Sequence, residues 1–329
     1  MANTYSPILK TILLTALALI AFAANSILCR LALGTEAIDA SGFTVIRLAT
    51  GAVVLLLIVG IQMQRTQGTT SDSGINHNDV TTQPIAGSND GGTRSVVRAS
   101  LMKKGSWFAA VMLFTYAATF SFAYVSMDTG TGALILFGAV QLTMIAVSLI
   151  RGNRLYWLEW LGVILAFGGF VYLVLPGLGT PSLIGFILMS LSGVAWGFYT
   201  LRGQGSEDPL GDTTSNFART VPMAIVLFVL MLSQLQLTAQ GVLLAMLSGG
   251  IASGVGYTIW YSALRGLSST QAAVLQLLVP VIAAVGGVIF MQEAITSRLL
   301  LSGVMILGGI LLVVLGRYYL SQCRMNQNT

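Results

Sequence analysis

Charged residues are scarce in this sequence: Asp, Glu, Lys and Arg make up 8% of its 329 residues, while hydrophobic residues make up 55%. Soluble domains typically carry about a quarter charged residues. The composition therefore excludes a water-soluble enzyme and indicates a protein that resides in a lipid bilayer. In that setting the net charge of +5 reflects Lys and Arg kept on the cytoplasmic side of the membrane, not binding to nucleic acid.

Groups that bind metals or carry out redox chemistry are also few. The chain has one histidine, His77, and two cysteines, Cys29 in an apolar run and Cys323 near the end. These give neither a disulfide framework nor a metal-binding cluster. The Gly-x-Ser-x-Gly motif of a serine nucleophile is absent from the sequence as well. We therefore expect no metal, no cofactor and no enzymatic activity.

What the sequence does contain is a series of long uncharged runs, which locate the membrane-spanning helices. An ionised side chain at the bilayer centre costs at least about 3 kcal/mol, and a helix needs about 20 residues to cross. Two runs are long enough for two helices each, since Pro and Gly break one at 176–182 and polar residues break the other at 233–241. An all-α membrane protein with ten helices is predicted, within the runs 11–29, 48–64, 105–127, 129–150, 160–201, 220–264, 266–292 and 299–316.

The basic residues indicate the orientation. With the N-terminus inside the cell, all but three of the 16 Lys and Arg residues lie at cytoplasmic helix ends, and the exceptions are Arg30, Arg47 and Arg298. Cytoplasmic loops of membrane proteins typically carry such an excess. We expect a multi-pass protein of the inner or plasma membrane with both termini in the cytoplasm. An alternative for the first helix is a cleaved signal peptide, since Lys10 precedes a short apolar core and 21–23 resembles a cleavage site.

One segment, from about Arg65 to Lys104, is polar instead of apolar. It is rich in Thr, Ser, Gly, Asn and Asp and contains His77. Such a segment cannot bury enough apolar area to fold alone. We expect a disordered cytoplasmic loop, with a regulatory or partner-binding role as the alternative.

The chain also carries signs of an internal repeat. A shift of 172 residues places Arg202 on Arg30 and Arg219 on Arg47, and beyond the polar loop a shift of 139 pairs Pro280 with Gln141. This predicts two five-helix repeats, residues 1–176, which include the 65–104 loop, and residues 177–329. Because five crossings is an odd number, the second repeat enters the membrane from the opposite side. Inverted repeats of this kind are typical of carriers that open alternately to either side around one central site.

Several segments resemble the EamA branch of the drug/metabolite transporter superfamily. The resemblance lies in the last three helices, in the opening pair and in the sixth helix, at 261–267, 271–280, 292–296, 303–309, Asn25-Ser26 with Arg30 and Arg47, and 195–197. It implies ten helices in two inverted five-helix repeats, and a carrier that moves small organic solutes, often amino acids or other metabolites, outward. The chain departs from the family at Gln141, where the fourth helix usually has proline.

Polar and aromatic residues near mid-helix are the candidates for contact with the solute, because polar groups that face lipid are left without hydrogen-bond partners. For the two glutamines the alternative is a hydrogen bond between helices, and for the aromatic residues it is packing. The predicted solute-binding residues are Asn25, Tyr116, Gln141, Trp196, Tyr257 and Gln276.

Four more residues are candidates for gating or coupling. Pro280 interrupts the ninth predicted helix, so we expect a kink there, either a hinge or a tolerated bend. Carboxylates are absent from the helix centres, so we expect either uniport-like export or coupling through a peripheral group, with Glu293 at an outer end as the candidate proton carrier. Arg47 and Arg219 lie one or two turns inside their helices. They either extend to the interface and pair structurally, or act in gating or anion recognition.

The pattern as a whole predicts a secondary carrier that moves a small organic metabolite, amino-acid-like or drug-like, outward by alternating access. Its expected partners are that small molecule and the lipid bilayer. A channel or a receptor-like membrane protein is the alternative, because either would also have ten apolar helices. The sequence specifies neither the solute nor the oligomeric state.

Overall fold

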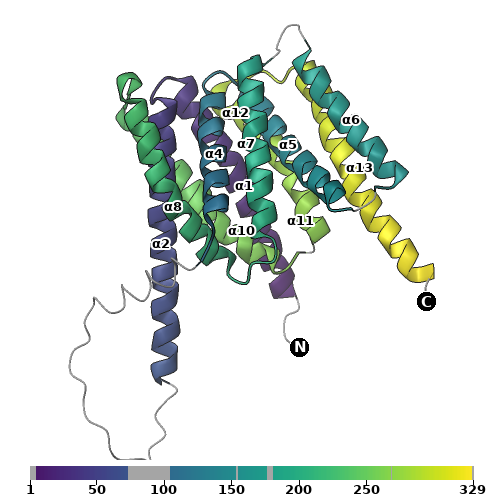
Figure 1. Ribbon diagram of the computed structural model, residues 1–329, viewed down its shortest axis with the longest axis horizontal. Coiled ribbons are helices and arrows are strands. Elements are labelled where there is room, and N and C mark those ends of the chain that lie inside the picture. The colour runs from purple at the N-terminus through teal and green to yellow at the C-terminus, as the bar shows by residue number, and fades with distance from the viewer. Residues whose placement is uncertain (1–4, 73–103, 153–154, 176–180, 268, 328–329) are drawn as a thin grey trace, which may run out of the picture.

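The computed structural model describes residues 5–72, 104–152, 155–175, 181–267 and 269–327. Within them, ten helical segments are long and apolar enough to cross a membrane, which confirms the predicted all-α membrane protein. The segments lie side by side in one bundle (Figure 1). In the first half the helices are α1 (Tyr5–Gly34), α2 (Ala40–Asp72), α4 (Trp107–Tyr124), α5 (Thr129–Ile150) and α6 (Trp157–Val174).

The second half contains irregular spans as well as continuous ones. Counted along the whole chain, the eighth span consists of α9, the π-helix η2 and α10 in succession. The ninth span consists of α11 followed by α12. The elements are α7 (Leu183–Gly203), α8 (Pro209–Leu230), the 3₁₀ turn η1 (Leu232–Gln234), α9 (Ala239–Leu247), η2 (Ser248–Val255), α10 (Gly256–Leu264), α11 (Ser269–Gln276), α12 (Leu278–Met291) and α13 (Ser297–Gln327).

Helix α2 is longer than expected. The sequence predicted its end near Gln64, where charge and polarity begin, but the helix continues to Asp72. The apolar span stops at Gln62, so the polar composition ends the membrane crossing and not the helix, which needs only backbone hydrogen bonds to continue. The rest of the predicted polar loop, 73–103 with His77, lies outside the described residues.

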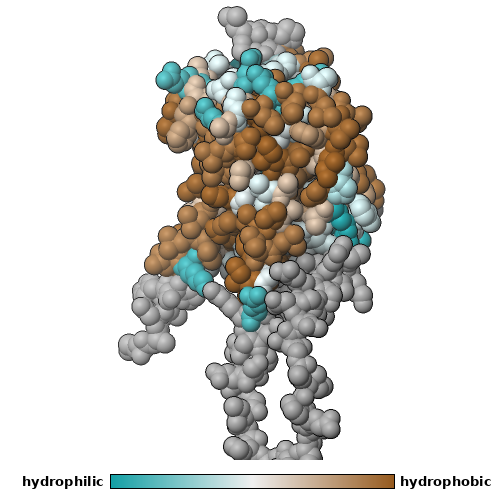
Figure 2. Space-filling model, turned by 90° about the vertical axis from the view of Figure 1, so that its left-hand side faces the viewer, coloured by the Kyte–Doolittle hydropathy of each residue, from teal (hydrophilic) through white to brown (hydrophobic). Residues whose placement is uncertain are grey.

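Apolar side chains cover the outside of the bundle. A broad hydrophobic band dominates the middle of the face in Figure 2, with hydrophilic residues gathered above and below it. Large apolar residues such as Leu57, Ile164 and Ile289 are exposed on the outside of the bundle. A hydrocarbon environment removes the cost of that exposure, as the ten-span interpretation requires.

Glycines allow close approach between helices at two interfaces. A methyl group on Gly162 of α6 would contact the carbonyl oxygen of Gly309 in α13, and one on Gly309 would contact the carbonyl oxygen of Gly162. A methyl group on Gly249 of η2 would contact the Arg47 carbonyl oxygen and the Thr50 hydroxyl of α2. Small residues at helix contacts let backbones pack closely in membranes, where dispersion contacts replace the hydrophobic effect. Gly162, Gly309 and Gly249 thus allow close packing of α6 with α13 and of η2 with α2.

The two halves of the chain interleave. Helix α1 packs against α10 and α12 more extensively than against α4 or α5, while α7 packs against α4 and α5. We call α1, α10 and α12 the α1 group, and α4, α5 and α7 the α7 group. The pairs α2 with α8, α5 with α12, and α6 with α13 pack across the two halves.

Candidate solute-binding cavity

A cavity of about 430 Å³ lies between the α1 group and the α7 group. Its mouth is formed by the start of α4 and by the exposed connection from α7 to α8. The mouth residues are Gly105, Ser106, Arg202, Gly203, Gln204, Gly205, Ser206, Pro209 and Asp212. The cavity thus opens at the end of the bundle where α7 ends and α8 begins, and its size suits a small organic molecule.

Aromatic rings form much of the cavity wall. The Trp196 ring stacks between Tyr199, with centroids 5.1 Å apart, and Tyr257, with centroids 5.4 Å apart. Tyr116 meets Trp196 at 4.7 Å, and Phe22 meets Tyr257 at 5.7 Å. All five rings line the cavity. They come from α1, α4, α7 and α10, so both groups supply flat apolar surface for a solute.

A hydrogen-bond chain crosses the bundle beside the cavity. Arg47 Nη2 donates to the Tyr116 hydroxyl over 2.8 Å, and Asn25 Nδ2 donates to the same oxygen over 3.2 Å. Ser248 Oγ donates to Asn25 Oδ1 over 2.5 Å, and Ser192 Oγ donates to the Tyr116 carbonyl over 3.0 Å. The chain joins α2, α4, α1, η2 and α7. Asn25 and Tyr116 are therefore held in fixed orientations at the cavity wall.

Arg47 is buried and does not extend to the membrane interface. Only 2% of its surface is exposed, and its guanidinium lies over the rings of Tyr116 and Phe120, at 5.1 and 4.9 Å from their centroids. Its Nη1 has no hydrogen-bond partner among the described residues. Arg219 instead lies over the Trp107 ring at 5.7 Å. The two arginines, paired by the proposed repeat, thus have different surroundings.

The ninth span is broken near Pro280, as its proline predicts. Helix α11 ends at Gln276 and α12 begins at Leu278, while Leu277 N donates to the Val274 carbonyl. Pro280 has no N–H to donate to the Gln276 carbonyl one turn earlier. Gln276 lines the cavity, so the break lies at the cavity wall.

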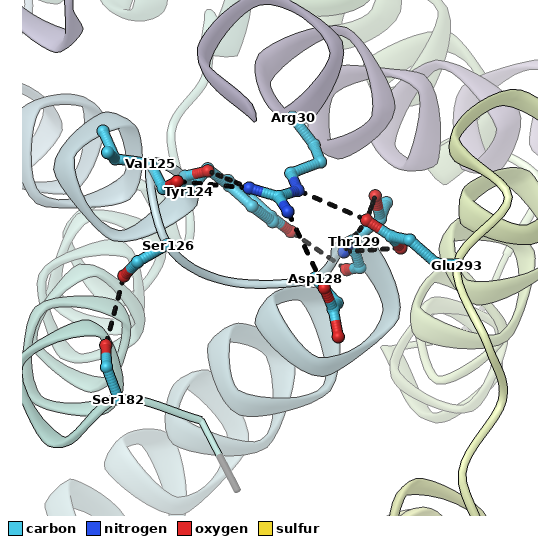
Figure 3. Close-up of polar contacts among 8 residues, drawn as sticks. All are labelled: Arg30, Tyr124, Val125, Ser126, Asp128, Thr129, Ser182 and Glu293. Atoms are coloured by element: carbon cyan, nitrogen blue, oxygen red, sulfur yellow. Dashed lines mark hydrogen bonds and ion pairs between the residues drawn. The ribbon is translucent and has the colours of Figure 1, made fainter. Parts of the chain in front are cut away.

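The end of the bundle opposite the mouth is held by ionic contacts around Glu293 (Figure 3). Both carboxylate oxygens of Glu293 accept from Thr129 N, at 3.0 and 2.9 Å, at the start of α5. A carboxylate at a helix N-terminus is stabilised by the unpaired N–H groups there. Arg30 Nε lies 3.3 Å from Glu293, and Arg30 Nη1 donates to the Tyr124 and Val125 carbonyls. These contacts fasten the α1 group to the α7 group at this end.

Two further contacts lie at the same end. Ile38, between α1 and α2, forms an isolated antiparallel bridge with Leu237, between α8 and α9, and Asp39 N donates to the Gln236 carbonyl. Ser126 and Ser182 share a hydrogen bond of 3.1 Å (Figure 3). Contacts between distant parts of the chain therefore close the bundle at this end.

At the mouth, side chains from the start of α8 bind the segment that leads into α4. Asp212 accepts from Gly105 N over 2.7 Å and from Ser206 Oγ over 2.6 Å. Lys104 Nζ donates to Asp208 over 2.6 Å. Partial burial of Asp208 opposes its ionisation, but hydrogen bonds from Lys104 and from Gly211 N, and the Lys104 charge, lower the pKa of its carboxyl below its ordinary value.

Five of the six predicted solute-binding residues line this cavity: Asn25, Tyr116, Trp196, Tyr257 and Gln276. Gln141 is buried in α5 but lies outside the lining. Ser253, Thr213 and Asn216 also line it and were not singled out from the sequence, and Arg202, which was named there only as the repeat counterpart of Arg30, lines it as well. Hydroxyl and amide residues are common in membrane helices, so their type alone gives no signal.

The ten spans and the cavity define a helical membrane protein with an internal cavity large enough for a small molecule. The model of the EamA-like transporter family matches residues 183–315. The chain is 44% identical over 308 residues to uncharacterized protein PA1977 of Pseudomonas aeruginosa, covering 94% of this chain and 96% of that protein. The chain belongs to the EamA-like transporter family, and is therefore a membrane transporter.

The fold is similar to that of a protein of known crystal structure. The TM-score is 0.54 with 16% sequence identity, and the match covers 91% of this chain and 98% of the other. At this identity the similarity concerns the fold alone.

Proposed function

We propose that this protein is a secondary carrier that moves a small organic metabolite outward across the inner or plasma membrane by alternating access. The central cavity is the proposed solute site. Both termini and the mouth of the cavity face the cytoplasm in this proposal, because the excess of Lys and Arg lies at that end of the helices.

One observation carries the proposal: the cavity lies between two helix groups that ionic and backbone contacts join at one end, whereas toward the mouth α7 and α10 meet through side chains, Trp196 against Tyr257 and Tyr199 and Tyr261 through Thr213. At the end with Arg30 and Glu293 the groups are fastened by the contacts around Thr129. At the opposite end the lining reaches the exposed connection between α7 and α8. This geometry supports an inward-open state of a carrier and disfavours an open channel.

The packing pattern supports two inverted repeats. When each helix of the first half is exchanged for its counterpart in the second, the contacts α1–α10 and α1–α12 become α7–α4 and α7–α5, which also exist. The pairs α2–α8, α5–α12 and α6–α13 map onto themselves. In a bundle with this symmetry, the two repeats can exchange conformations. The end that is now closed then opens, and the end that is now open closes.

The repeat-related residues Arg30 and Arg202 lie at opposite ends of the cavity. Arg30, in the last turn but one of α1, is bound to Glu293 and near Asp128, whereas Arg202, in the last turn of α7, lies at the open mouth. We infer that the outward-open state releases Arg30 and brings Arg202 into contact with the α1 group. Arg30 then closes one end of the cavity in the inward-open state, and Arg202 closes the other end in the outward-open state.

Counterflow tests the proposal. A growth-inhibition panel of amino acids, nucleosides and toxic analogues, in cells with and without the protein, first identifies a transported class. Purified protein in liposomes preloaded with the unlabelled compound should then accelerate uptake of the labelled compound. A channel gives no such acceleration, and neither does a receptor, so uptake that ignores the preload refutes the carrier.

A further inference from the structure

The positive charge of Arg47 lacks a carboxylate partner among the described residues. Arginine stays protonated in proteins, and its 2% exposure removes it from water. The carboxylates that the structure describes lie at helix ends or in connections: Glu36, Asp39, Asp128, Glu159, Glu207, Asp208, Asp212 and Glu293. A buried charge without a counter-ion is costly, so the interior beside the cavity is electrically suited to an anion.

The Tyr116 hydroxyl relays that charge to the cavity. Its oxygen accepts from Arg47 Nη2 and from Asn25 Nδ2, while the described residues provide no acceptor for its own hydrogen. A hydroxyl that accepts from a cation is a strengthened donor, because hydrogen bonds in a chain polarise one another. Since Tyr116 lines the cavity, an acceptor group of a solute is the partner that fits it.

Ser253 provides a second donor. Its Oγ is buried, lines the cavity and has no hydrogen-bond partner in the described part of the chain. It lies five residues after Ser248 in the π-helix η2, and five residues is the hydrogen-bonding interval of that helix. Ser253 therefore follows Ser248, and the chain from Ser248 to Tyr116, along one side of η2. An orphaned buried hydroxyl in a native protein indicates a missing partner.

Away from the mouth, the described residues that line the cavity include no carboxylate that could pair with a cation. Asp212, the acidic residue of the described lining, lies at the mouth, where its two oxygens accept from Gly105 and Ser206. Arg202, at the same mouth, adds positive charge. Trp196 and Tyr257, stacked on one another, both line the cavity and give it apolar ring surface.

We propose that the cavity selects organic anions, specifically carboxylates that carry a flat apolar ring. The carboxylate accepts hydrogen bonds from the Tyr116 and Ser253 hydroxyls within the positive field of Arg47, and the ring packs against Trp196 and Tyr257. This inference rests on the proposed function, since it specifies the solute of the same cavity. Compounds with a free ammonium group, cationic or zwitterionic, bind more weakly because the inner cavity offers that group no carboxylate.

Three compounds with the same indole ring test the charge preference. Titration calorimetry on the purified full-length protein compares indole-3-acetate, tryptophan and tryptamine, which are an anion, a zwitterion and a cation at pH 7. Indole-3-acetate should bind at least about tenfold more tightly than the other two, the equivalent of one hydrogen bond to a charged group. Equal or tighter binding of tryptamine or tryptophan overturns the proposal, as does failure of all three to bind.

Two variants locate the carboxylate. Tyr116→Phe and Ser253→Ala should each weaken indole-3-acetate about tenfold while changing tryptamine less than twofold. Tyr116→Phe removes a hydrogen bond of Arg47 and can disturb the folded protein. Ser253→Ala removes a hydroxyl that has no partner among the described residues, so this variant should fold as the unmodified protein does. Ser262→Ala on the exposed side of α10 is the matched control, and it should bind as the unmodified protein does. Unchanged anion affinity in Ser253→Ala overturns the proposed site.

The anion preference and the carrier proposal can be refuted independently of one another. If indole-3-acetate binds with this preference but shows no counterflow, the carrier proposal is wrong and the anion preference stands. If counterflow occurs with tryptamine and not with indole-3-acetate, the carrier stands and the anion preference is wrong.

Discussion

Arg30 and Glu293, separated by 263 positions in the chain, form an ion pair with Nε and Oε1 3.3 Å apart. Each residue also holds the α7 group: Arg30 donates to the Tyr124 carbonyl, and Glu293 accepts from Thr129 N. The pair therefore joins two sets of helices and not merely two residues. These contacts hold the two groups together at this end of the bundle.

The break at Pro280 is predicted to serve movement at the cavity wall. Pro280→Ala supplies an N–H for the Gln276 carbonyl, so α11 and α12 become one continuous helix. We expect the free energy of unfolding to rise by up to about 3 kcal/mol, and the rate of counterflow to fall. Thermal unfolding in detergent and counterflow in liposomes measure the two effects.

Pro222 provides the control for that substitution. It lies inside α8, which stays continuous from Pro209 to Leu230. Pro222→Ala should stabilise the protein without slowing counterflow. A Pro280→Ala protein that exchanges solute at the unmodified rate would show that the break is only a tolerated bend.

The contact between η2 and α2 is predicted to require glycine at position 249. In Gly249→Ala the added methyl group meets the Arg47 carbonyl oxygen and the Thr50 hydroxyl, and overpacking of this kind costs about 1–3 kcal/mol. In Gly308→Ala the methyl group has nothing within 4 Å, and the change should be neutral or stabilising by about 0.5–1 kcal/mol. Thermal unfolding of both variants tests this, and equal melting temperatures would refute the close packing.

The ion pair between Lys104 and Asp208 is predicted to make a small, pH-dependent contribution to stability. Because the pKa of Asp208 is lowered in the folded protein, the contribution is complete above the unfolded pKa of about 3.9 and is lost as the pH falls through the folded value. Lys104→Met should lower the melting temperature slightly and by the same amount from pH 8 to pH 5, since pairs this exposed are weak.

The same substitution at Lys10, exposed on α1, separates the ion pair from a general effect of lost charge. Lys10→Met should leave the melting temperature unchanged over that range. If the effect of Lys104→Met varied between pH 8 and pH 5, a group other than Asp208 would be its source.

The sequence predicted the spans and the polar–aromatic wall better than the contacts between helices. Uncharged runs locate helices because lipid excludes charge over a fixed thickness, and Pro280 marked the broken span. The packing of α1 against the second half was not predictable, because pairing of apolar helices depends on shape and not on composition. The role of Arg30 was missed for the same reason: its partner Glu293 is distant in sequence.

Spin-label distances at both ends of the bundle test the central claim, alternating access, without any knowledge of the solute. One label pair, Val125→Cys with Ile295→Cys, spans the two groups at the Glu293 end, and another, Gln204→Cys with Arg265→Cys, spans them at the mouth; all four positions are exposed. Cys29→Ala and Cys323→Ser remove the native thiols. Asp128→Asn is the control for loss of charge, because Asp128 is 3.7 Å from Arg30 and largely exposed.

Glu293→Gln removes the charge that holds Arg30 and should favour the state with the opposite end closed. We predict that the 125–295 distance lengthens while the 204–265 distance shortens in the same variant, and that Asp128→Asn changes neither. A Glu293→Gln protein in which one distance changes alone, or both change in the same direction, would contradict alternating access around this cavity.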